Sequence, residues 1–241
     1  MEEKHCVVAI DGPAGVGKST VSRAVASRLG FCYVDTGAIY RAISLKAHRL
    51  GIPPDADEQL AALVNDTTVA FALPTDGEPP GAAAAAAGQR VLLDGTDVTE
   101  EIRDPEINRV VSVYSANRAV RRRLVALQRR MGQSGDVVME GRDIGTAVFP
   151  DAELKFFLDA ASEVRSRRRL DELLSKGVKT CFEETRRDLE ARDKTDRSRA
   201  ESPLARAADA EFIDTSELGV AEVVDRIVSR IRARRGDPVQ S

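Results

Sequence analysis

Short apolar runs alternate with longer stretches of helical periodicity along most of this chain. Each run is too short to form a helix and is followed by an acidic residue or ends beside one. The runs are Cys6–Ile10, Phe31–Val34, Val137–Met139, Leu154–Leu158 and Glu211–Ile213. Short apolar strands separated by helices are typical of a parallel sheet that is covered on both faces. The pattern therefore predicts an α/β fold with a five-stranded parallel sheet flanked by helices.

Helices are predicted between these strands. The clearest lies near the C-terminus, where the apolar residues fall on one helical face: Val220, Val223, Val224, Ile227 and Ile231. Another is expected to begin at Asp104-Pro105-Glu106, with Asp104 as the N-cap and Pro105 as the first helical residue.

Residues 51–103 interrupt the alternation. Two β-like pieces, Val69–Leu73 and Arg90–Leu93, flank a Pro-Pro-Gly and the six alanines Ala82–Ala87. We predict one domain over residues 1–241, with its core formed by residues 1–50 and 104–241 and an inserted subdomain formed by residues 51–103. The alanine run is interpreted as a loop, because so few residues do not make a stable isolated helix.

A phosphate-binding loop is the clearest chemical motif. Residues 12–19 read G-P-A-G-V-G-K-S and match the pattern G-x-x-x-x-G-K-[ST] between a predicted strand and a predicted helix. The glycines allow backbone N–H groups to surround phosphate oxygens, Lys18 can reach the β- and γ-phosphates, and the Ser19 hydroxyl can bind Mg²⁺. The motif predicts an ATP site with Mg²⁺, formed by Gly12, Pro13, Ala14, Gly15, Val16, Gly17, Lys18, Ser19 and Thr20.

Composition excludes several other classes of function. The net charge is −3, so no global positive field attracts nucleic acid or anionic membranes. No apolar run approaches the roughly 18 residues of a membrane span, and the N-terminal segment does not have the form of a signal peptide. The two histidines argue against a histidine-based zinc site, and the three separated cysteines suggest a reduced, cytoplasmic protein.

The phosphate-binding loop alone does not show what kind of reaction the bound nucleotide takes part in. A GTPase switch needs an N-K-x-D motif, which this sequence lacks. Arginines instead follow two of the predicted strands, at Arg41 and Arg142, and such loops lie at the ligand-binding edge of an open α/β sheet. This placement favours a kinase with an anionic acceptor over a nucleotide-dependent binding switch, which remains the alternative.

Three further motifs carry a family resemblance. They are D-T-G-A-I-Y-R at residues 35–41, G-R-D-I-G-T at 141–146 and R-D-K-T-D-R-S-R at 192–199. In this order they resemble the bacterial cytidylate kinases, a family of P-loop nucleoside monophosphate kinases. The likeness runs from Val7 to about Arg232 and is weakest in the alanine-rich stretch.

The resemblance implies a reaction and a set of partners. A member of this family transfers the γ-phosphate of ATP to CMP, and we expect dCMP to serve as well, as part of pyrimidine nucleotide metabolism in the cytoplasm. It implies a monomer, an acceptor-binding subdomain at residues 51–103, and a helical lid at residues 162–177. A UMP or deoxynucleotide kinase is the nearest alternative.

The resemblance also implies residue roles. Arg41, Arg142 and Arg199 align with arginines that hold the acceptor phosphate. The base is read in the family by groups that align with Ser112, Arg121 and Asp143. The ribose and nearby phosphate are contacted by residues that align with Arg192 and Asp196. Thr36 stands where many relatives have serine and retains the hydroxyl. The expected catalytic residues are Lys18, Arg142, and Arg165 or Arg169 of the lid.

Overall fold

The computed structural model describes residues 5–72 and 89–236. Within them, five parallel strands form the central sheet in the order β2-β6-β1-β7-β8. Their bounds are β1 Val7–Asp11, β2 Cys32–Asp35, β6 Val137–Gly141, β7 Leu154–Asp159 and β8 Glu211–Asp214. The predicted five-stranded parallel sheet is confirmed, and each strand extends to include the acidic residue that was expected to follow it, with β6 running one residue further.

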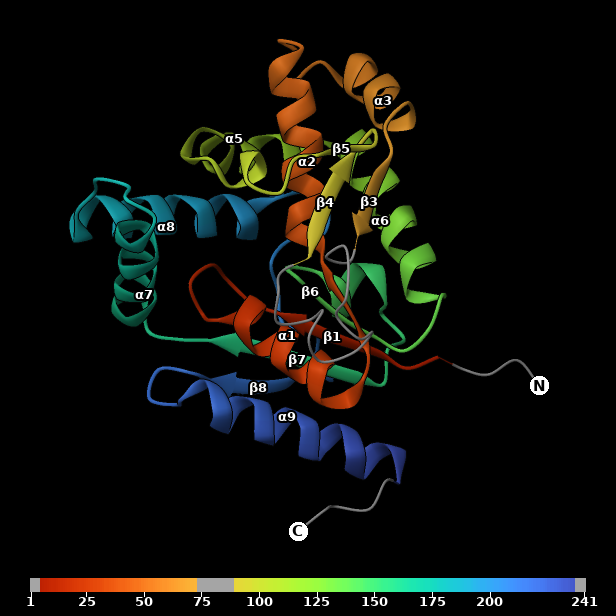
Figure 1. Cartoon of the computed structure of the whole chain (residues 1–241), viewed down its shortest axis with the longest axis vertical. Coiled ribbons are helices and arrows are strands. Elements are labelled where there is room, and N and C mark those ends of the chain that lie inside the picture. The colour runs from red at the N-terminus through yellow and green to blue at the C-terminus, as the bar shows by residue number, and fades with distance from the viewer. Residues whose placement is uncertain (1–4, 73–88, 237–241) are drawn as a thin grey trace.

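Helices cover both faces of this sheet (Figure 1). On one face α1, Lys18–Leu29, lies beside α9, Val220–Arg235. Their apolar stripes form one buried cluster with β1, β7 and β8, to which Val25, Val224 and Ile227 belong. The predicted face of α9 is buried except for its first residue, Val220, which is exposed.

The other face carries α2, Thr36–Arg49, and α6, Arg118–Gly132, with α3, Asp57–Asn65, and α5, Pro105–Ala116, packed around them. The helix α5 begins at Pro105 as predicted, but the Asp104 side chain makes no capping hydrogen bond. Two more helices, α7 at Ser162–Ser175 and α8 at Phe182–Ser198, project beside the sheet (Figure 1).

The segment within residues 51–103 contains a small antiparallel sheet, ordered β3-β4-β5. The strands are β3 Val69–Ala72, β4 Arg90–Leu93 and β5 Thr96–Asp97. Asp94 and Gly95, both with positive φ, form the tight turn between β4 and β5. The helix α3 was not recognised in the sequence, and the alanine run at 82–87 lies outside the described residues.

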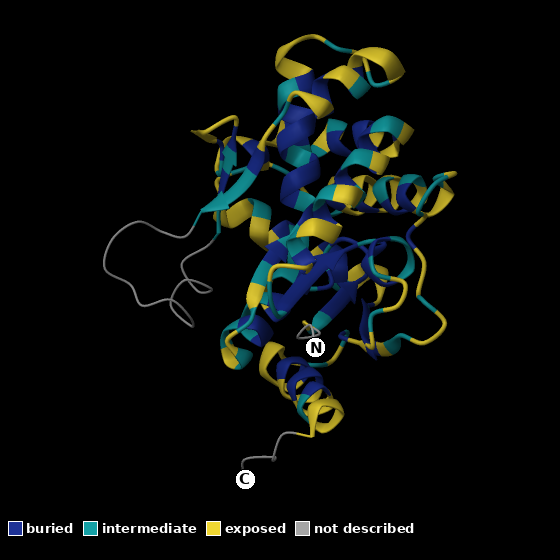
Figure 2. Cartoon of the chain, turned by 90° about the vertical axis from the view of Figure 1, so that its right-hand side faces the viewer, coloured by how far each residue is buried: buried dark blue, intermediate teal, exposed yellow. Residues whose placement is uncertain are grey.

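This small sheet shares an apolar core with the helices beside the central sheet. Its buried side chains, such as Val91 and Leu93, belong to the same apolar cluster as Ile39 and Ile43 of α2. Figure 2 shows that the buried residues gather in the interior of the molecule and the exposed ones at its margins. A side-chain contact also joins the two sheets: Gln89 donates to the carbonyl of Tyr33 at 2.7 Å and accepts from the N–H of Asp35 at 3.5 Å. The glutamine amide thus occupies hydrogen-bonding positions on the open edge of β2.

Candidate active site

The phosphate-binding loop connects β1 to α1. Gly15 and Gly17 have φ angles of 79° and 91°, and Gly17 is the N-cap of α1 without any side-chain capping bond. The first N–H groups of α1 are therefore available to an anion. The Lys18 side chain is buried and its Nζ donates to the carbonyl of Pro13 at 2.6 Å, across the curve of the loop.

Gly12 shows why the loop requires glycine where the strand ends. Its φ is 150°, and a Cβ built there would lie 2.0 Å from the carbonyl oxygen of Leu158 on β7. We expect Gly12→Ala to lower the free energy of unfolding by about 2 kcal/mol or more, because backbone strain and overlap with a backbone atom add together.

Gly30 provides the matched control. It also has a positive φ, 69°, but nothing lies within 4 Å of its Cβ position. Gly30→Ala should cost only about 1 kcal/mol of conformational strain. Urea unfolding of both variants measures the difference, and equal losses of stability would contradict the close approach of β7 to the loop.

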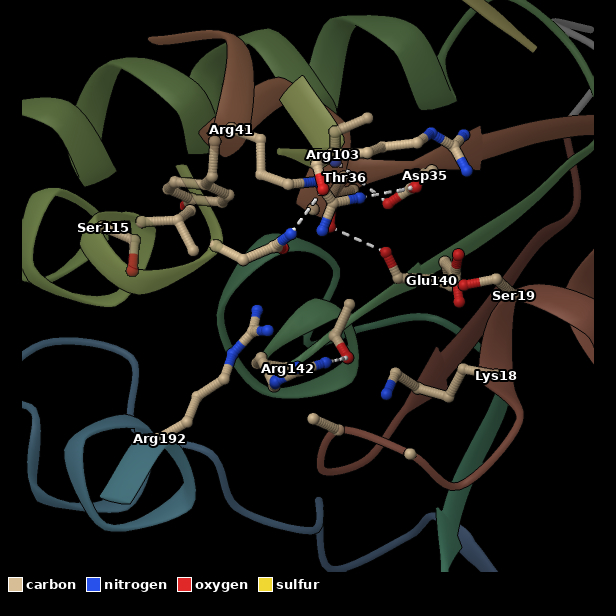
Figure 3. A pocket seen from close by; sticks show the side chains of 18 of the residues that line it. Lys18, Ser19, Asp35, Thr36, Arg41, Arg103, Ser115, Glu140, Arg142 and Arg192 are labelled. Atoms are coloured by element: carbon tan, nitrogen blue, oxygen red, sulfur yellow. Dashed lines mark hydrogen bonds and ion pairs between the residues drawn. The ribbon is translucent and has the colours of Figure 1, made fainter. Parts of the chain in front are cut away.

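One cleft of about 470 Å³ brings the loop and the acceptor motifs together. It is lined on the loop side by Ala14, Gly15, Gly17, Lys18, Ser19 and Thr20, and on the other side by all nine residues expected to bind the acceptor: Thr36, Arg41, Ser112, Arg121, Arg142, Asp143, Arg192, Asp196 and Arg199. Figure 3 shows that Arg41, Arg142, Arg192 and Lys18 enter it from different elements. Gly12, Pro13 and Val16 do not line it, and the Val16 side chain is buried in the core.

Internal carboxylates hold most of the acceptor arginines. The Asp35 side chain caps α2 by accepting from the N–H of Ala38 and also pairs with Arg41 at 3.0 Å. Arg142 donates from Nε to Asp196 at 3.0 Å, and Arg199 lies 3.6 Å from the same carboxylate. The arginines are thereby fixed in orientation before any phosphate binds, which reduces the entropy lost on binding.

Arg192 is the exception to this pairing. Its Nε is buried and makes no hydrogen bond to any part of the chain that the structure describes. Burial, and then the nearby cation of Arg142, lower the pKa of Arg192 to about 9 despite the opposing effect of Asp196. A phosphate dianion bound here would offset the repulsion between Arg192 and Arg142.

The expected base-reading residues form a buried cluster. Arg121 donates to Asp143 at 2.5 Å and to the carbonyl of Ser115 at 3.1 Å, and its guanidinium lies 5.2 Å from the centre of the Tyr40 ring. Ser112 on α5 lines the same end of the cleft. Of the neighbouring arginines Arg121, Arg122 and Arg123, Arg121 alone is buried.

Glu140, at the end of β6, was not among the predicted site residues. One carboxylate oxygen accepts a hydrogen bond from the Tyr33 hydroxyl at 2.5 Å, and the other is buried without a hydrogen-bond partner among the described residues. Burial, with Asp35 nearby, raises the pKa of Glu140, while the Lys18 cation and the hydroxyl groups of Tyr33 and Ser19 act in the opposite direction. A carboxylate oxygen open toward a hydroxyl and a lysine is a suitable group for a hydrated Mg²⁺.

Asp11, at the end of β1, was also missed. Its two carboxylate oxygens accept from the N–H groups of Ile144 and Gly145, at 2.9 and 2.7 Å. Burial raises the pKa of Asp11 to about 7 against the opposing effect of these bonds. These amides open η2, a π-helical turn at Ile144–Val148 that directly follows Arg142 and Asp143. The strand that leads into the phosphate-binding loop therefore also holds the G-R-D segment.

The sequence could have indicated both Asp11 and Glu140, because each is the first acidic residue after a predicted strand. Arg23, Tyr33, Asp35 and Arg103 also line the cleft without having been predicted. Nothing in the local sequence distinguishes Arg23 or Arg103 from solvent-exposed arginines, since their positions depend on how the helices pack.

The lid helix α7 carries four arginines, of which Arg165, Arg168 and Arg169 make different contacts in the structure. Arg165 is buried and donates to the carbonyl of Ala14 at 3.2 Å and to Asp193 at 2.5 Å, and it does not line the cleft. Arg168 donates to Thr215. Arg169 does line the cleft, with an ion pair to Glu172 at 2.7 Å. Of the two lid residues predicted to be catalytic, the geometry brings only Arg169 to the site.

An anion-binding loop at a helix N-terminus thus faces a second, arginine-lined anion site across one cleft. This arrangement, on a strand–loop–helix unit of a parallel sheet, is that of a P-loop kinase with a phosphorylated acceptor. The sequence profile of the cytidylate kinases matches residues 8–233. The chain belongs to the cytidylate kinase family, whose reaction is the phosphorylation of CMP or dCMP by ATP.

Individual relatives agree over nearly the whole length. The chain is 50% identical over 227 residues to a cytidylate kinase of Desulfitobacterium hafniense, covering 94% of this chain and 93% of that one. It is 46% identical over 228 residues to a cytidylate kinase of Geobacter sulfurreducens, covering 95% and 93%. A crystal structure of an uncharacterized protein from Eubacterium ventriosum shares the fold, with a TM-score of 0.52 at 13% identity over 96% of this chain and all of that one.

No helix within residues 5–72 and 89–236 is both long and apolar enough to cross a membrane.

Proposed function

We propose that this chain transfers the γ-phosphoryl group of MgATP directly to the phosphate of CMP or dCMP within the described cleft. The observation that carries the proposal is the position of Lys18 and the acceptor arginines on opposite sides of one cleft. An acceptor phosphate is already ionised at neutral pH, so the transfer needs positioning and charge neutralisation rather than a general base.

The phosphate-binding loop supplies the donor side. Its backbone N–H groups and the N-terminus of α1 would hold the phosphates of ATP, with Lys18 turning from the Pro13 carbonyl to the β- and γ-phosphates. The residues present fit Mg²⁺, because the Ser19 hydroxyl and the open oxygen of Glu140 are hard oxygen ligands beside the loop. Mg²⁺ when bound would neutralise charge on the phosphates of ATP.

The arginines supply the acceptor side. Arg41, Arg142 and Arg199, oriented by their carboxylate partners, would hold the acceptor phosphate. Arg192 would add a further cation, whose buried Nε makes no hydrogen bond among the described residues. A guanidinium fork matches two phosphate oxygens at once. We assign Arg169 of α7, rather than Arg165, to the transferring phosphate, and we retain residues 162–177 as the lid that excludes water.

The base would be read by Ser112, Arg121 and Asp143. Cytosine presents an exocyclic amine that a carboxylate can accept from, and O2 and N3 acceptors that a guanidinium can donate to. Uracil presents the opposite pattern at N3 and C4. The buried Arg121–Asp143 pair is therefore matched to cytosine.

Asp143→Asn tests this assignment. The asparagine amide can donate to O4 of uracil, so the preference for CMP over UMP, measured as the ratio of kcat/KM values, should fall about 10-fold or more. Asp209→Asn is a suitable control, since Asp209 is an exposed partner of Lys155 outside the cleft. An unchanged preference in folded Asp143→Asn would remove Asp143 from the base site.

The reaction itself is tested by ADP release from MgATP with CMP, dCMP, UMP, AMP and GMP offered in turn. Strong turnover with CMP and dCMP, and little with the purine nucleotides, is the expected result. No acceptor-stimulated release from folded protein would overturn the proposed function and favour a nucleotide-dependent switch. We retain a monomer as the expected state, which sedimentation during the same assays would test.

A further inference from the structure

Glu140 is held by one of its two carboxylate oxygens. Oε1 accepts from the Tyr33 hydroxyl, and Oε2 is buried without a hydrogen-bond partner in the described part of the chain. The obvious cation, Lys18, donates to Pro13 instead. The Ser19 hydroxyl and the Lys18 cation are nevertheless close enough to lower the pKa of this carboxyl group, so they are its nearest polar neighbours on the side of the phosphate-binding loop. Figure 3 shows that Glu140 lies on the same side of the cleft as Ser19 and Lys18.

Tyr33 is itself fixed from several directions. Its backbone lies in β2, where it pairs with Val138 of β6, two residues from Glu140. Its carbonyl accepts from Gln89, and the Arg23 guanidinium lies 5.9 Å from the centre of its ring. Arg23 also donates to the carbonyl of Ser19 at 3.3 Å, so the residue that covers the ring is anchored on the helix that follows the phosphate-binding loop.

The carboxyl group of Glu140 can rotate about its terminal bond, whereas the tyrosine cannot easily move. A hydrogen bond from a fixed phenol to one oxygen therefore sets the plane of the carboxylate and the direction of the other oxygen. Without it, the free oxygen could turn toward Lys18 or away from the cleft. The distance of 2.5 Å between the phenol and carboxylate oxygens is that of a strong, charge-assisted bond.

We propose that Tyr33 is a positioning residue for the cation of the donor nucleotide: its hydroxyl orients Glu140 so that the open oxygen faces the Ser19 side of the phosphate-binding loop. This inference rests on the proposed function, because it takes Glu140 and Ser19 as the groups nearest to the bound Mg²⁺. Tyr33 borders the cleft, but its hydroxyl donates to Glu140 and would act on the cation through that carboxylate.

Tyr33→Phe isolates the hydroxyl, since the ring, its contact with Arg23 and the strand all remain. The chain also offers a matched control: Tyr114 donates to the carbonyl of Ile52 at 2.7 Å, outside the cleft. Tyr114→Phe removes a hydrogen bond of the same kind, and both variants should lose a similar, small amount of thermal stability.

The discriminating measurement is Mn²⁺ binding to the enzyme–ADP complex, read from the electron paramagnetic resonance signal of free Mn²⁺. Tyr33→Phe should weaken this binding about 10-fold, the usual effect of removing a group that orients a metal ligand, and Tyr114→Phe should leave it unchanged. In turnover assays the Mg²⁺ concentration for half-maximal rate should rise for Tyr33→Phe, while KM for CMP remains as in the parent enzyme.

Two further variants, Glu140→Gln and Glu140→Gln combined with Tyr33→Phe, distinguish a wrong role for Tyr33 from a wrong placement of Mg²⁺ beside Glu140. If Tyr33 acts through Glu140, adding Tyr33→Phe to Glu140→Gln should weaken Mn²⁺ binding no further. Additive losses, or an unchanged affinity in Tyr33→Phe beside a weakened Glu140→Gln, would overturn the role of Tyr33 and leave the cation site in place. Unchanged affinity in both single variants would overturn the role of Tyr33 together with the placement of Mg²⁺ beside Glu140.

Discussion

Lys18→Met should reduce turnover by about 10²–10³-fold or more while leaving the protein folded. Methionine keeps the length and the apolar stem of the side chain, but it cannot neutralise the charge that develops between donor and acceptor phosphates. The lysine is also the only cationic side chain of the phosphate-binding loop, residues 12–19. Steady-state ADP release at saturating MgATP and CMP measures the effect.

The same change should not destabilise the protein. Burial, and then the neighbouring Arg142, lower the pKa of Lys18 to about 7, so below that pH the folded state holds a charge that is better solvated when unfolded. Because the pKa is lower in the folded state, the unfolded chain binds more protons between about pH 7 and the ordinary lysine value, and this group's contribution to stability rises with pH across that window. Lys18→Met should remove that rise, and its thermal midpoint at pH 7 should equal or exceed that of the parent.

Lys155 supplies the control for this experiment. It is buried like Lys18 and donates to the carbonyl of a proline five residues earlier, Pro150, but it also pairs with Asp209 outside the cleft. Lys155→Met should cost stability and leave turnover within a few fold of the parent. Near-normal turnover in folded Lys18→Met would remove the assignment of the phosphate-binding loop to catalysis.

Arg142→Ala should lower kcat/KM for CMP by about 10²-fold, with a much smaller effect on the affinity for ATP. The guanidinium lies between the two halves of the cleft and is held there by Asp196, so its loss removes a phosphate ligand and also leaves a buried carboxylate without its closest cation. The variant should therefore raise KM for CMP and reduce kcat together.

The measurement compares initial rates over a range of CMP concentrations with ATP binding followed separately by calorimetry. Arg129→Ala is the control, because Arg129 donates to the carbonyls of Ala147 and Val148 from outside the cleft. An unchanged dependence on CMP in Arg142→Ala would contradict the acceptor role, whatever happened to the rate at saturation.

The sequence predicted the central sheet because each strand is a short apolar run with a clear end. It predicted the phosphate-binding loop because that motif is local: backbone geometry, lysine and hydroxyl all lie within residues 12–19. The helix α3, Asp57–Asn65, was missed although Leu60, Leu63 and Val64 have the i, i+3, i+4 spacing of one helical face, because only 9 residues carry the pattern. In the structure these side chains are buried against α2 and α6.

The acceptor residues could be grouped only through the family motifs. Arg41, Arg121 and Arg192 come from helices far apart in the chain, and no spacing rule brings them into one cleft. Arg165 and Arg169 show the limit of helical periodicity. They are one turn apart and share a face, yet Arg165 donates to the carbonyl of Ala14 and to Asp193 of α8, while Arg169 lines the cleft. The difference depends on how α7 packs against α8, which periodicity does not predict.

The helix α8 reaches both halves of the molecule. Its Asp193 pairs with Arg165, which donates to the carbonyl of Ala14 in the phosphate-binding loop. One turn later, its Asp196 pairs with Arg142 of the acceptor site. The two nucleotides therefore act on one rigid element, and their affinities should be linked. By thermodynamic reciprocity, whatever factor ATP applies to the dissociation constant of CMP, CMP must apply to that of ATP.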